Sequence, residues 1–457
     1  LALVVAELIL IAGAAFVTAS VPVAWITALL AVVALAVGTL ATDRILRTQG
    51  NAFRNKILGE VQRAIQKLHP EVALYHGMSQ GDAVYQVDGW LSPMEQVPRP
   101  TIVIVRSVAT LESMGATTLP VLAITRAQDL LHLDLTTLRA CLFVANTGDV
   151  IHLIREQNPM SAFIGHGDSD KNSSFNPFTK VYDEVWVAGE AGEQRYSRAK
   201  IGMRTEQFVY VGRPQLDAID MSVLPSGESD RTPTVLYAPT WEGWNSEQEY
   251  CSLLTQGVKV IEQLLAHERP IRLIYKPHPF TGLRTAAART ASNRIIGMIQ
   301  AANARNGFTN TPPAPSTAAE TKSAKEANEL ATSVGNEFFA RLDQHEHVVI
   351  HPDAGLGLFQ CFEHADSLIT DISSVLSDFI ATGRPYAVCN PRKVSEAAFI
   401  DEFPSTRGGV VIDRSGENAR DFLDVVTGSA PDALRVQRDE VREFLLGSTT
   451  PTATERF

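Results

Sequence analysis

Residues 367–385 read SLITDISSVLSDFIATGRP, and this stretch indicates how the second half of the chain folds. A short apolar run, 367–369, is followed at once by the cap-forming residues Asp371 and Ser373 and then by apolar residues at helical spacing. Gly383 is of the residue type that ends helices, and another apolar run follows it. This order predicts a strand, a tight turn and a helix, as in an α/β fold with parallel strands.

The same turn is a candidate anion site. Ser373 and Ser374 offer two hydroxyls beside the N–H groups of a helix N-terminus, where a phosphate or pyrophosphate binds readily. Asp371 belongs to this predicted phosphate-binding turn as well. Taken alone, the stretch is equally well interpreted as a capped helix without a ligand.

Length, charge and cysteine content limit the classes of protein to consider. The 457 residues suffice for two domains with large cores. A net charge of −11 argues against a nucleic-acid partner bound through a general basic surface. The four cysteines are scattered, without a CxxC pair or a Cys/His cluster, and are expected to be reduced core residues in a cytosolic setting.

The N-terminal residues are apolar enough to cross a membrane. No charged residue occurs over 8–42, and the segment divides at 20–22 into halves of about 20 residues, near the length of a membrane-spanning helix. Arg44 and Arg47 follow, which favours a cytoplasmic position for the rest of the chain. We therefore expect a transmembrane hairpin over residues 1–43. One span with a re-entrant segment and a cleaved signal peptide are the alternatives.

Beyond this segment, short β-rich runs alternate with helix-length stretches, the pattern of doubly wound parallel sheets. We expect a juxtamembrane amphipathic helix over 44–70, an N-terminal α/β domain over 71–221, a Pro- and Gly-punctuated linker over 222–233 and a C-terminal α/β domain over 234–447. The expected strands are 101–105, 121–124, 141–145, 162–164, 184–187 and 208–211, and then 234–237, 271–275, 348–350, 367–369, 386–389 and 409–412.

Two further segments complete the predicted organisation. Residues 303–329 are rich in Ala, Thr, Pro, Lys and Glu and are expected to form a flexible insertion in the C-terminal domain. Residues 448–457 are expected to be a tail. The two α/β domains are expected to face each other across a cleft.

A histidine between two glycines, Gly165-His166-Gly167, follows one of the expected strands. Its imidazole has little steric cover and suits a general base that takes a proton from a hydroxyl. Lys171, a little further on, could meet an anionic group. The alternative is a glycine-rich turn whose histidine caps a backbone carbonyl.

Two other turns carry candidate ligand-binding residues. In the run KPHP at 276–279, two prolines stiffen the loop around His278, and an imidazole and a lysine held in this way suit a phosphate. After the strand at 234–237, Thr240 offers a hydroxyl and Trp241 or Trp244 a stacking face, although domain packing also explains both tryptophans. Because ligands of open α/β sheets lie outside the carboxyl ends of the strands, all these turns are expected to gather on that edge.

In this order, the motifs resemble the CDP-glycerol glycerophosphotransferase family, the primases and polymerases of wall teichoic acid. The resemblance covers the chain from about residue 162 to the C-terminus and is carried by GHG at 165–167, YAPTW at 237–241, KPHP at 276–279 and TDISSV at 370–375. It implies a GT-B fold in which the second domain holds the donor nucleotide and the first holds the acceptor.

Residue by residue, the resemblance makes His166 the catalytic base on the acceptor hydroxyl. The predicted donor-phosphate contacts are Lys276, His278, Ser373, Ser374 and Asp371, with Lys171, Arg213, Thr240 and Arg384 as lower-ranked candidates. Two departures from the family pattern are expected near the substrate pockets: the turn at 165–169, where the family usually has a Trp-His-Gly-Thr type of turn, and Ile372, where many members have an aromatic residue.

The predicted fold is thus a GT-B-type pair of doubly wound domains preceded by a two-helix transmembrane hairpin. The predicted function is a transferase of the cell membrane with cytoplasmic catalytic domains, which moves a polyol-phosphate such as glycerol-phosphate from a CDP-activated donor to a hydroxyl of a lipid-linked glycan or teichoic-acid-like polymer and releases CMP. The predicted mechanism requires no metal, and no cofactor is predicted. A GT-B glycosyltransferase that uses a nucleotide-sugar and a non-catalytic envelope-assembly scaffold are the alternatives. The oligomeric state stays open.

Overall fold

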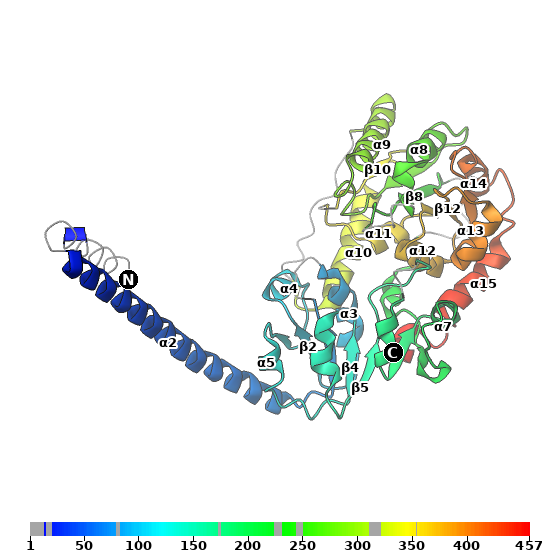
Figure 1. Cartoon of the computed structure of the whole chain (residues 1–457). Helices are drawn as coiled ribbons and strands as arrows, with labels where there is room; N and C mark the ends of the chain where they lie inside the picture. The colour runs from blue at the N-terminus through cyan, green and yellow to red at the C-terminus, as the bar shows by residue number, and fades with distance from the viewer. Residues whose placement is uncertain are drawn as a thin grey trace. The chain divides into compact units, whose positions relative to one another are not determined.

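The structure is a computed structural model that describes residues 13–14, 21–78, 83–171, 175–223, 231–243, 250–309, 321–352 and 354–457. The chain divides into two compact units. The first comprises Leu1–His69 with His132–Leu135, and the second comprises Pro70–Leu131 with Thr136–Phe457. The first unit contains the long helix α2 (Val21–Leu68), which is blue in Figure 1.

Helix α2 is unbroken over 48 residues, a length of about 72 Å at 1.5 Å per residue. Among the described residues it is the one helix long and apolar enough to cross a membrane, as judged by length and composition. The predicted juxtamembrane helix continues this same helix, and Pro22 lies in its first turn, where proline is tolerated. Most of the first half of the predicted hairpin lies outside the described residues, so the hairpin is not confirmed.

The second unit contains two sheets, each with all strands parallel. The first sheet has the order β3-β2-β1-β4-β5-β6-β7. Its strands are β1 (Val72–His76), β2 (Thr101–Val105), β3 (Val121–Ala123), β4 (Ala140–Phe143), β5 (Met160–Phe163), β6 (Glu184–Val187) and β7 (Phe208–Tyr210). The helices between them are α3 (Tyr85–Glu95), α4 (Val108–Ser113), α5 (Ala127–Leu130), α6 (Ile151–Ile154) and α7 (Glu190–Arg198).

The second sheet repeats this arrangement with the order β10-β9-β8-β11-β12-β13. Its strands are β8 (Thr234–Ala238), β9 (Arg272–Tyr275), β10 (Val348–Val349), β11 (Ser367–Thr370), β12 (Tyr386–Cys389) and β13 (Val410–Ile412). The helices are α8 (Gly257–Leu265), α9 (Ala286–Arg305), α10 (Ala324–Ala340), α11 (Leu358–Glu363), α12 (Ser374–Phe379), α13 (Glu396–Glu402), α14 (Ala419–Val426), α15 (Arg435–Leu446) and α16 (Ala453–Arg456).

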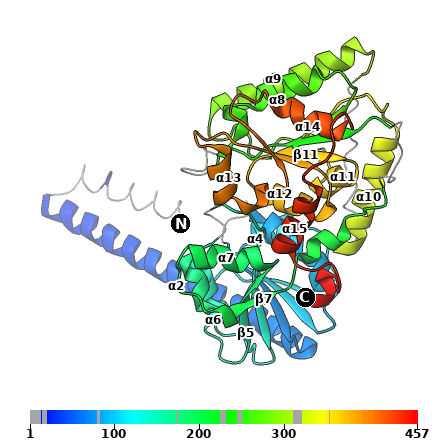
Figure 2. The same ribbon diagram turned by 90° about the vertical axis from the view of Figure 1, so that its right-hand side faces the viewer.

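Helices cover both faces of the second sheet, which explains why apolar residues of its strands point to both faces. One core cluster joins the strands to α8, α9 and α14, and the other joins them to α10, α11, α12, α13 and α15. Figure 2 shows α8, α9 and α14 together on one side of β11, with α11 and α12 on the other. The four cysteines are buried and free, as predicted.

The prediction of two parallel-sheet α/β domains is confirmed. The expected strands 101–105, 184–187 and 386–389 coincide with β2, β6 and β12, and the other predicted strands match to within a few residues. β1 was not predicted, although it lies in the middle of the first sheet. Its sequence, VALYH, has only four apolar residues before the histidine, and a run this short does not separate a strand from a buried helix segment.

The segment predicted as a flexible insertion is shorter than expected. Asn303 is fully buried in α9, and its amide makes hydrogen bonds of 2.7 and 2.9 Å to the backbone of His347. The Ser323 hydroxyl caps α10, so helical structure resumes at Ala324. Residues 310–320, the middle of the predicted insertion, lie outside the described residues, as do residues 224–230 of the predicted linker.

The residues predicted as a tail pack on the first sheet instead. Helix α16 precedes Phe457, whose ring centroid lies 5.2 Å from that of Trp90 and 5.5 Å from that of Trp186. Arg456 donates a hydrogen bond of 3.2 Å to the Val211 carbonyl, just after β7. The chain therefore returns to the first α/β half after completing the second.

Candidate active site

The predicted motifs gather at the carboxyl edges of the two sheets. The strand order reverses between β1 and β4 in the first sheet and between β8 and β11 in the second. At such a switch point the connections leave on opposite faces, which opens a crevice outside the strand ends where ligands bind. The Gly-His-Gly turn follows β5 at the first edge, and the other three motifs follow β8, β9 and β11 at the second.

His166 is held at the first switch point by a glycine turn and by the end of β4. Gly165 has a φ of 61°, a conformation that favours glycine, and its carbonyl accepts a 2.7 Å hydrogen bond from the Trp90 indole. The Nδ1 atom of His166 lies 3.0 Å from the Val144 carbonyl oxygen. Because a carbonyl only accepts hydrogen bonds, Nδ1 carries the proton, and Nε2 of the neutral ring keeps its lone pair.

The surroundings of this ring favour its neutral form. His166 keeps a solvent-exposed edge, but the atoms packed around the ring desolvate it and lower its pKa below the usual range. The hydrogen bond to Val144 raises the pKa, and Arg213 lowers it. Tyr85 stands beside the ring with 5.7 Å between centroids and 82° between planes. Such an imidazole can accept a proton from a hydroxyl near neutral pH.

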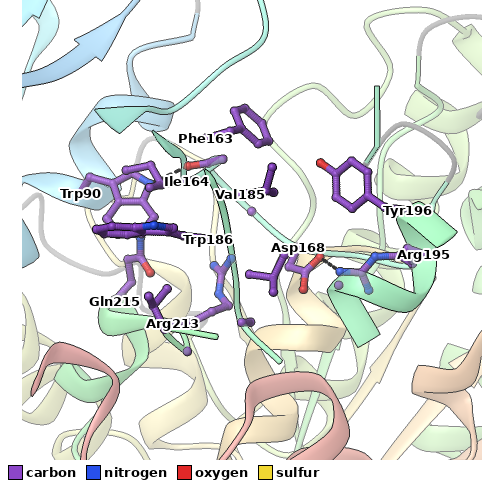
Figure 3. Close-up of a pocket in the computed structure, with 17 residues that line it drawn as sticks. Trp90, Phe163, Ile164, Asp168, Val185, Trp186, Arg195, Tyr196, Arg213 and Gln215 are labelled. Carbon is purple, nitrogen blue, oxygen red and sulfur yellow. Dashed lines mark hydrogen bonds and ion pairs between the residues drawn. The ribbon is translucent and has the colours of Figure 1, made fainter. Parts of the chain in front are cut away.

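A pocket lies beside the Gly-His-Gly turn at the ends of β5, β6 and β7 (Figure 3). Two tryptophan rings line one side, and on the other the Asp168 carboxylate pairs with the Arg195 guanidinium. Asp170 also pairs with Arg195, at 3.2 Å, and accepts a hydrogen bond of 2.9 Å from the Ser405 backbone N–H in the second half of the chain. These contacts fix the segment that follows His166.

Asp371 connects the two turns that flank the second switch point. Its side chain has no exposed surface, and Oδ2 accepts hydrogen bonds from the backbone N–H groups of Thr240 at 2.8 Å and Ser252 at 3.2 Å. Burial raises the pKa of this carboxyl to about 7, although Ser252, Thr240 and nearby Lys171 act in the opposite direction. A carboxylate sealed in this way braces the site from behind. It does not reach a phosphate, contrary to our expectation.

His278 is held in the opposite hydrogen-bonding state to His166. The Phe280 backbone N–H donates to His278 Nδ1 at 3.1 Å, so Nδ1 is unprotonated and Nε2 of the neutral ring carries the proton. Burial and, to a smaller extent, Lys171 lower the pKa of His278 to about 4, and Glu242 opposes this shift. Trp241 stacks on the imidazole with 5.8 Å between centroids and 15° between planes, so its ring supports the histidine. Trp244, the other predicted stacking residue, lies outside the described residues.

Lys171 extends from the first half of the chain to the turn after β8 in the second. Its ammonium lies 3.3 Å from the Thr240 hydroxyl and 5.4 Å from the centre of the Tyr250 ring. It also lies close enough to His278 and Asp371 to lower the pKa of both. A cation predicted only as a lower-ranked candidate therefore lies among the predicted phosphate-binding turns.

The two serines of the turn after β11 differ in accessibility. Ser373 is buried and its hydroxyl makes a weak contact of 3.4 Å to the Asp371 carbonyl, whereas Ser374 is exposed. A side-chain Cβ placed on Gly167 would lie 3.5 Å from Ser374 Cβ, so the Gly-His-Gly turn and the serine turn are neighbours. Helix α12 has only six residues, so the turn offers hydroxyl and N–H groups rather than a long helix dipole.

Two predicted phosphate contacts have backbone partners elsewhere. Lys276 donates a hydrogen bond of 2.9 Å to the Leu356 carbonyl, before α11. Arg384 donates to the carbonyls of Phe362 and Ala365 at 2.6 and 2.9 Å, at the end of α11. Both cations thus satisfy carbonyls around a short helix, a requirement that the sequence pattern around each residue does not reveal.

Two other predicted residues also occupy structural positions. Arg213 forms an ion pair of 2.9 Å with Asp378 of α12 and so joins the two α/β halves. Burial raises the pKa of Asp378 to about 6, and Arg213 lowers it. Ile372 is buried in the core of the second half, behind the turn of Ser373 and Ser374. Its place behind the turn requires an apolar side chain that packs.

Sequence reasoning missed three residues of the site. Glu242 is fully buried and accepts hydrogen bonds of 3.0–3.1 Å from backbone N–H groups at 282, 284 and 285, which holds the loop after His278. His76 ends the unpredicted strand β1, and Tyr85 begins α3. A prediction of β1 would have placed His76 at the carboxyl edge; nothing in the local sequence identifies Glu242 as a brace.

Comparisons with known proteins find similarity in overall structure. No protein-family model matches the chain, nor does any curated protein. Similar solved structures include a Listeria monocytogenes protein described as a UDP-N-acetylglucosamine 2-epimerase, which is 11% identical, with 84% of this chain and 94% of that chain covered and a TM-score of 0.49. The wall teichoic acid polymerase TagF is 13% identical, with 84% and 86% covered and a TM-score of 0.47. Anabaena HepE in complex with UDP-glucose is 11% identical, with 85% and 97% covered and a TM-score of 0.43.

Proposed function

We propose that this protein is a membrane-anchored transferase that moves a polyol-phosphate, such as glycerol-phosphate, from a CDP-activated donor to a hydroxyl of a lipid-linked glycan or teichoic-acid-like polymer. The observation that carries the proposal is a pair of histidines, one after β5 and one after β9, each near the switch point of its sheet. His166 has a free Nε2 lone pair that suits a base, whereas His278 has an Nε2–H that suits a phosphate oxygen. The family resemblance of the four motifs supports the same assignment.

On the acceptor side, His166 takes the proton from the attacking hydroxyl. Its neutral form is favoured by desolvation, so the base is available near neutral pH. The hydrogen bond from Nδ1–H to Val144 orients the ring and selects the tautomer. The proximity of Gly167 to Ser374 supports a path in which the hydroxyl and the donor phosphate meet between these two turns.

On the donor side, Lys171, His278 and the serine turn bind the pyrophosphate. His278 donates from Nε2–H, Lys171 adds positive charge, and Ser373 and Ser374 contribute hydroxyl and N–H donors. Thr240 is positioned for the same site by its N–H bond to Asp371. Lys276 and Arg384 act in folding, through the carbonyls that they bind.

The reaction is an in-line displacement at the β-phosphorus. The acceptor oxygen forms a bond to this phosphorus, and the bond from phosphorus to the bridging oxygen of the pyrophosphate breaks. CMP leaves with the bridging oxygen and its charge, which Lys171, His278 and the serine turn stabilise, while the hydroxyl proton moves to His166.

Anchoring to a membrane is part of the proposal. The exposed apolar residues of α2 give a segment of bilayer length, and basic side chains follow it, which supports a cytoplasmic catalytic unit. A hairpin with a preceding span would return the chain to its starting side. The helix continues well beyond the thickness of a hydrocarbon core, about 30 Å, so α2 also forms a stalk outside it.

Identification of the nucleotide product tests the reaction. Detergent-solubilised protein is incubated with CDP-glycerol, CDP-ribitol and a panel of UDP- and GDP-sugars, and the released nucleotides are separated by chromatography. CMP released from a CDP-polyol only when a glycan or polymer acceptor is present supports the proposal. Release of a nucleoside diphosphate from a sugar donor would establish a glycosyltransferase instead, and a folded protein that binds no donor would favour a scaffold.

A further inference from the structure

The pocket beside the Gly-His-Gly turn has no role in the mechanism proposed above. Gly165 and Gly167, the two neighbours of the candidate base, both line it (Figure 3). The other lining residues belong to β5, β6, α3 and α7 or follow β7, so the whole pocket is built by the first α/β half. The proposed donor contacts other than Lys171 lie in the second half. The pocket is therefore placed on the acceptor side of the candidate base.

The size of the pocket limits its occupant. Its volume is about 50 Å³. One water needs about 10–15 Å³ on the same measure, so the pocket has room for a group of about six non-hydrogen atoms. A sugar ring with its substituents has about twice as many atoms and does not fit inside.

The aromatic wall of the pocket is held in place by its neighbours. The Trp90 indole N–H donates a hydrogen bond of 2.7 Å to the Gly165 carbonyl, and that of Trp186 donates one of 2.6 Å to Glu184. Both rings also pack on Phe457, with 5.2 and 5.5 Å between centroids. Because both N–H groups are used elsewhere, the tryptophans offer the pocket apolar surface, and a fixed apolar wall suits the C–H groups of a ligand.

The charged groups that line the pocket are paired. Asp168 pairs with Arg195, which also pairs with Asp170 at 3.2 Å, and Arg213 pairs with Asp378 at 2.9 Å. The two guanidinium groups of the lining are thus matched by three carboxylates. A phosphate requires positive charge that is not already matched, so this lining disfavours it. A hydroxyl can donate to a carboxylate and accept from a guanidinium without carrying any charge.

The groups around these ion pairs do not change this balance. Gln215 and Tyr196, which also line the pocket, are neutral. Arg456 lies behind Gly212 and donates hydrogen bonds to three backbone carbonyls. The pocket thus combines an apolar wall with polar groups that suit hydroxyls.

We propose that this pocket binds the end group of the acceptor, and that this end group is a neutral polyol of about three carbon atoms. Its carbon atoms lie against Trp90 and Trp186, and its hydroxyls meet Asp168 and Arg213. An end group held there lies next to the turn that carries His166. The assignment to the acceptor rests on the proposed function, whereas the binding of a polyol does not.

The test locates polyol binding by fluorine NMR. Full-length protein in detergent, with its five tryptophans replaced by fluorotryptophan, is titrated with glycerol and with glycerol phosphate. The signals of Trp90 and Trp186 are assigned with the variants Trp90→Phe and Trp186→Phe. Trp241 is the internal control, because it stacks on His278 at the proposed donor site.

We expect glycerol to shift the Trp90 and Trp186 signals but not the Trp241 signal. The dissociation constant should be on the order of millimolar, as for a ligand of about six non-hydrogen atoms. Glycerol phosphate should bind in this pocket at least about fivefold more weakly than glycerol, because the guanidinium groups are already paired.

Two variants change the pocket in different ways. Val211→Leu fills part of it and should weaken glycerol binding about tenfold. Val121→Leu is the matched control, since Val121 lies in β3 at the opposite edge of the same sheet, and it should bind as the wild type does. Asp168→Asn keeps an oxygen for Arg195 but removes one negative charge, so the preference for glycerol over glycerol phosphate should fall about fivefold. Thermal midpoints show which variants fold as the wild type does.

Three outcomes would overturn the pocket as a polyol site. Glycerol shifts neither tryptophan signal of the wild type, glycerol phosphate binds there more tightly than glycerol, or a folded Val211→Leu variant binds glycerol as the wild type does. The first two need no variant, so they decide the matter even if Val211→Leu does not fold.

Failure of the proposed function is a separate result. If glycerol binds beside Trp90 and Trp186 but no CDP-polyol is consumed, the polyol pocket stands and the reaction is wrong. If CMP is released but glycerol shifts neither signal, the reaction stands and the pocket is wrong. If CDP-glycerol displaces glycerol from the pocket and CMP does not, the polyol of the donor is the occupant and the assignment to the acceptor is wrong.

Discussion

His166 and His278 are the same amino acid in opposite hydrogen-bonding states, and their partners determine this difference. A backbone carbonyl receives the Nδ1 proton of His166, whereas a backbone N–H donates to Nδ1 of His278. The assignment of roles at the residue scale therefore rests on two backbone groups, of Val144 and Phe280. Both are supplied by chain geometry and not by any particular side-chain type.

Removal of the proposed base gives the prediction at this scale. His166→Ala should reduce kcat about a hundredfold or more, because no other group takes the acceptor proton, while donor affinity stays close to that of the wild type. The measurements are single-turnover CMP release and calorimetric donor binding. His345→Ala is the control, since His345 contacts Thr232 at the amino ends of the second sheet. Wild-type turnover by His166→Ala would remove this histidine from the mechanism.

At the scale of elements, the donor site depends on connections between turns. Asp371 joins the turn after β11 to that after β8, and Glu242 joins the latter to the loop after β9. Neither carboxylate is exposed. Each holds backbone N–H groups in place, so the positions of Thr240 and His278 depend on buried carboxyl groups.

Stability as a function of pH tests the Asp371 connection. Its pKa is about 7 in the folded protein and 3.8 when unperturbed, so the native state binds more protons between these values. The free energy of unfolding contributed by this group is therefore present below pH 3.8 and is lost as the pH rises through 7, with a slope of at most about 1.4 kcal/mol per pH unit. Asp371→Asn keeps a carbonyl oxygen for the two N–H donors and does not titrate.

The stability of Asp371→Asn relative to wild type should therefore rise from pH 5 to pH 8. Urea unfolding followed by tryptophan fluorescence at four pH values measures this difference. Asp401→Asn, at an exposed position of α13, is the control and should show a constant difference. Parallel stability curves for Asp371→Asn and wild type would show that the carboxyl does not carry the proton in the folded state.

At the scale of the whole molecule, the membrane segment and the donor site belong to different units. The residues proposed to contact the donor all lie in the second unit, whereas α2 lies in the first. Deletion of residues 1–50 should therefore release the protein from membranes and leave donor affinity unchanged. Flotation on a density gradient and donor titration measure the two effects. Loss of donor binding by a truncated protein that still unfolds cooperatively would mean that this segment is part of the active fold.

Two substitutions in the full-length chain also test whether α2 anchors the protein to membranes. Substitution of Leu30 and Val33 of α2 by aspartate places charge in the apolar segment, where each costs about 2.5–3.5 kcal/mol in a bilayer centre. The variant should partition away from membranes as the deletion does. Retention on membranes by both proteins would show that another surface binds the lipid.

Much of the fold and part of the site could be predicted from local sequence. The serine turn, the Gly-His-Gly turn and the proline-flanked histidine were recognisable because turn residues and apolar periodicity act over a few neighbouring positions. The central strand β1 was missed because its five residues are too few to show whether the apolar periodicity is that of a strand or of a helix. The partners of Lys276, Arg384 and Ile372 could not be predicted for another reason: they belong to α11 and the core, which are distant in sequence.

By itself, the sequence determined the two parallel α/β halves, which motif follows which strand, and the sheet edge at which the polar turns collect. These follow from strand and helix periodicity and from the short range of turn chemistry. Only the tertiary structure decided which nitrogen of each histidine is free, that Lys171 crosses to the second half, and that Asp371 is a buried brace. Each of these depends on a partner far away in the chain, because hydrogen bonding and desolvation act between groups that only folding brings together.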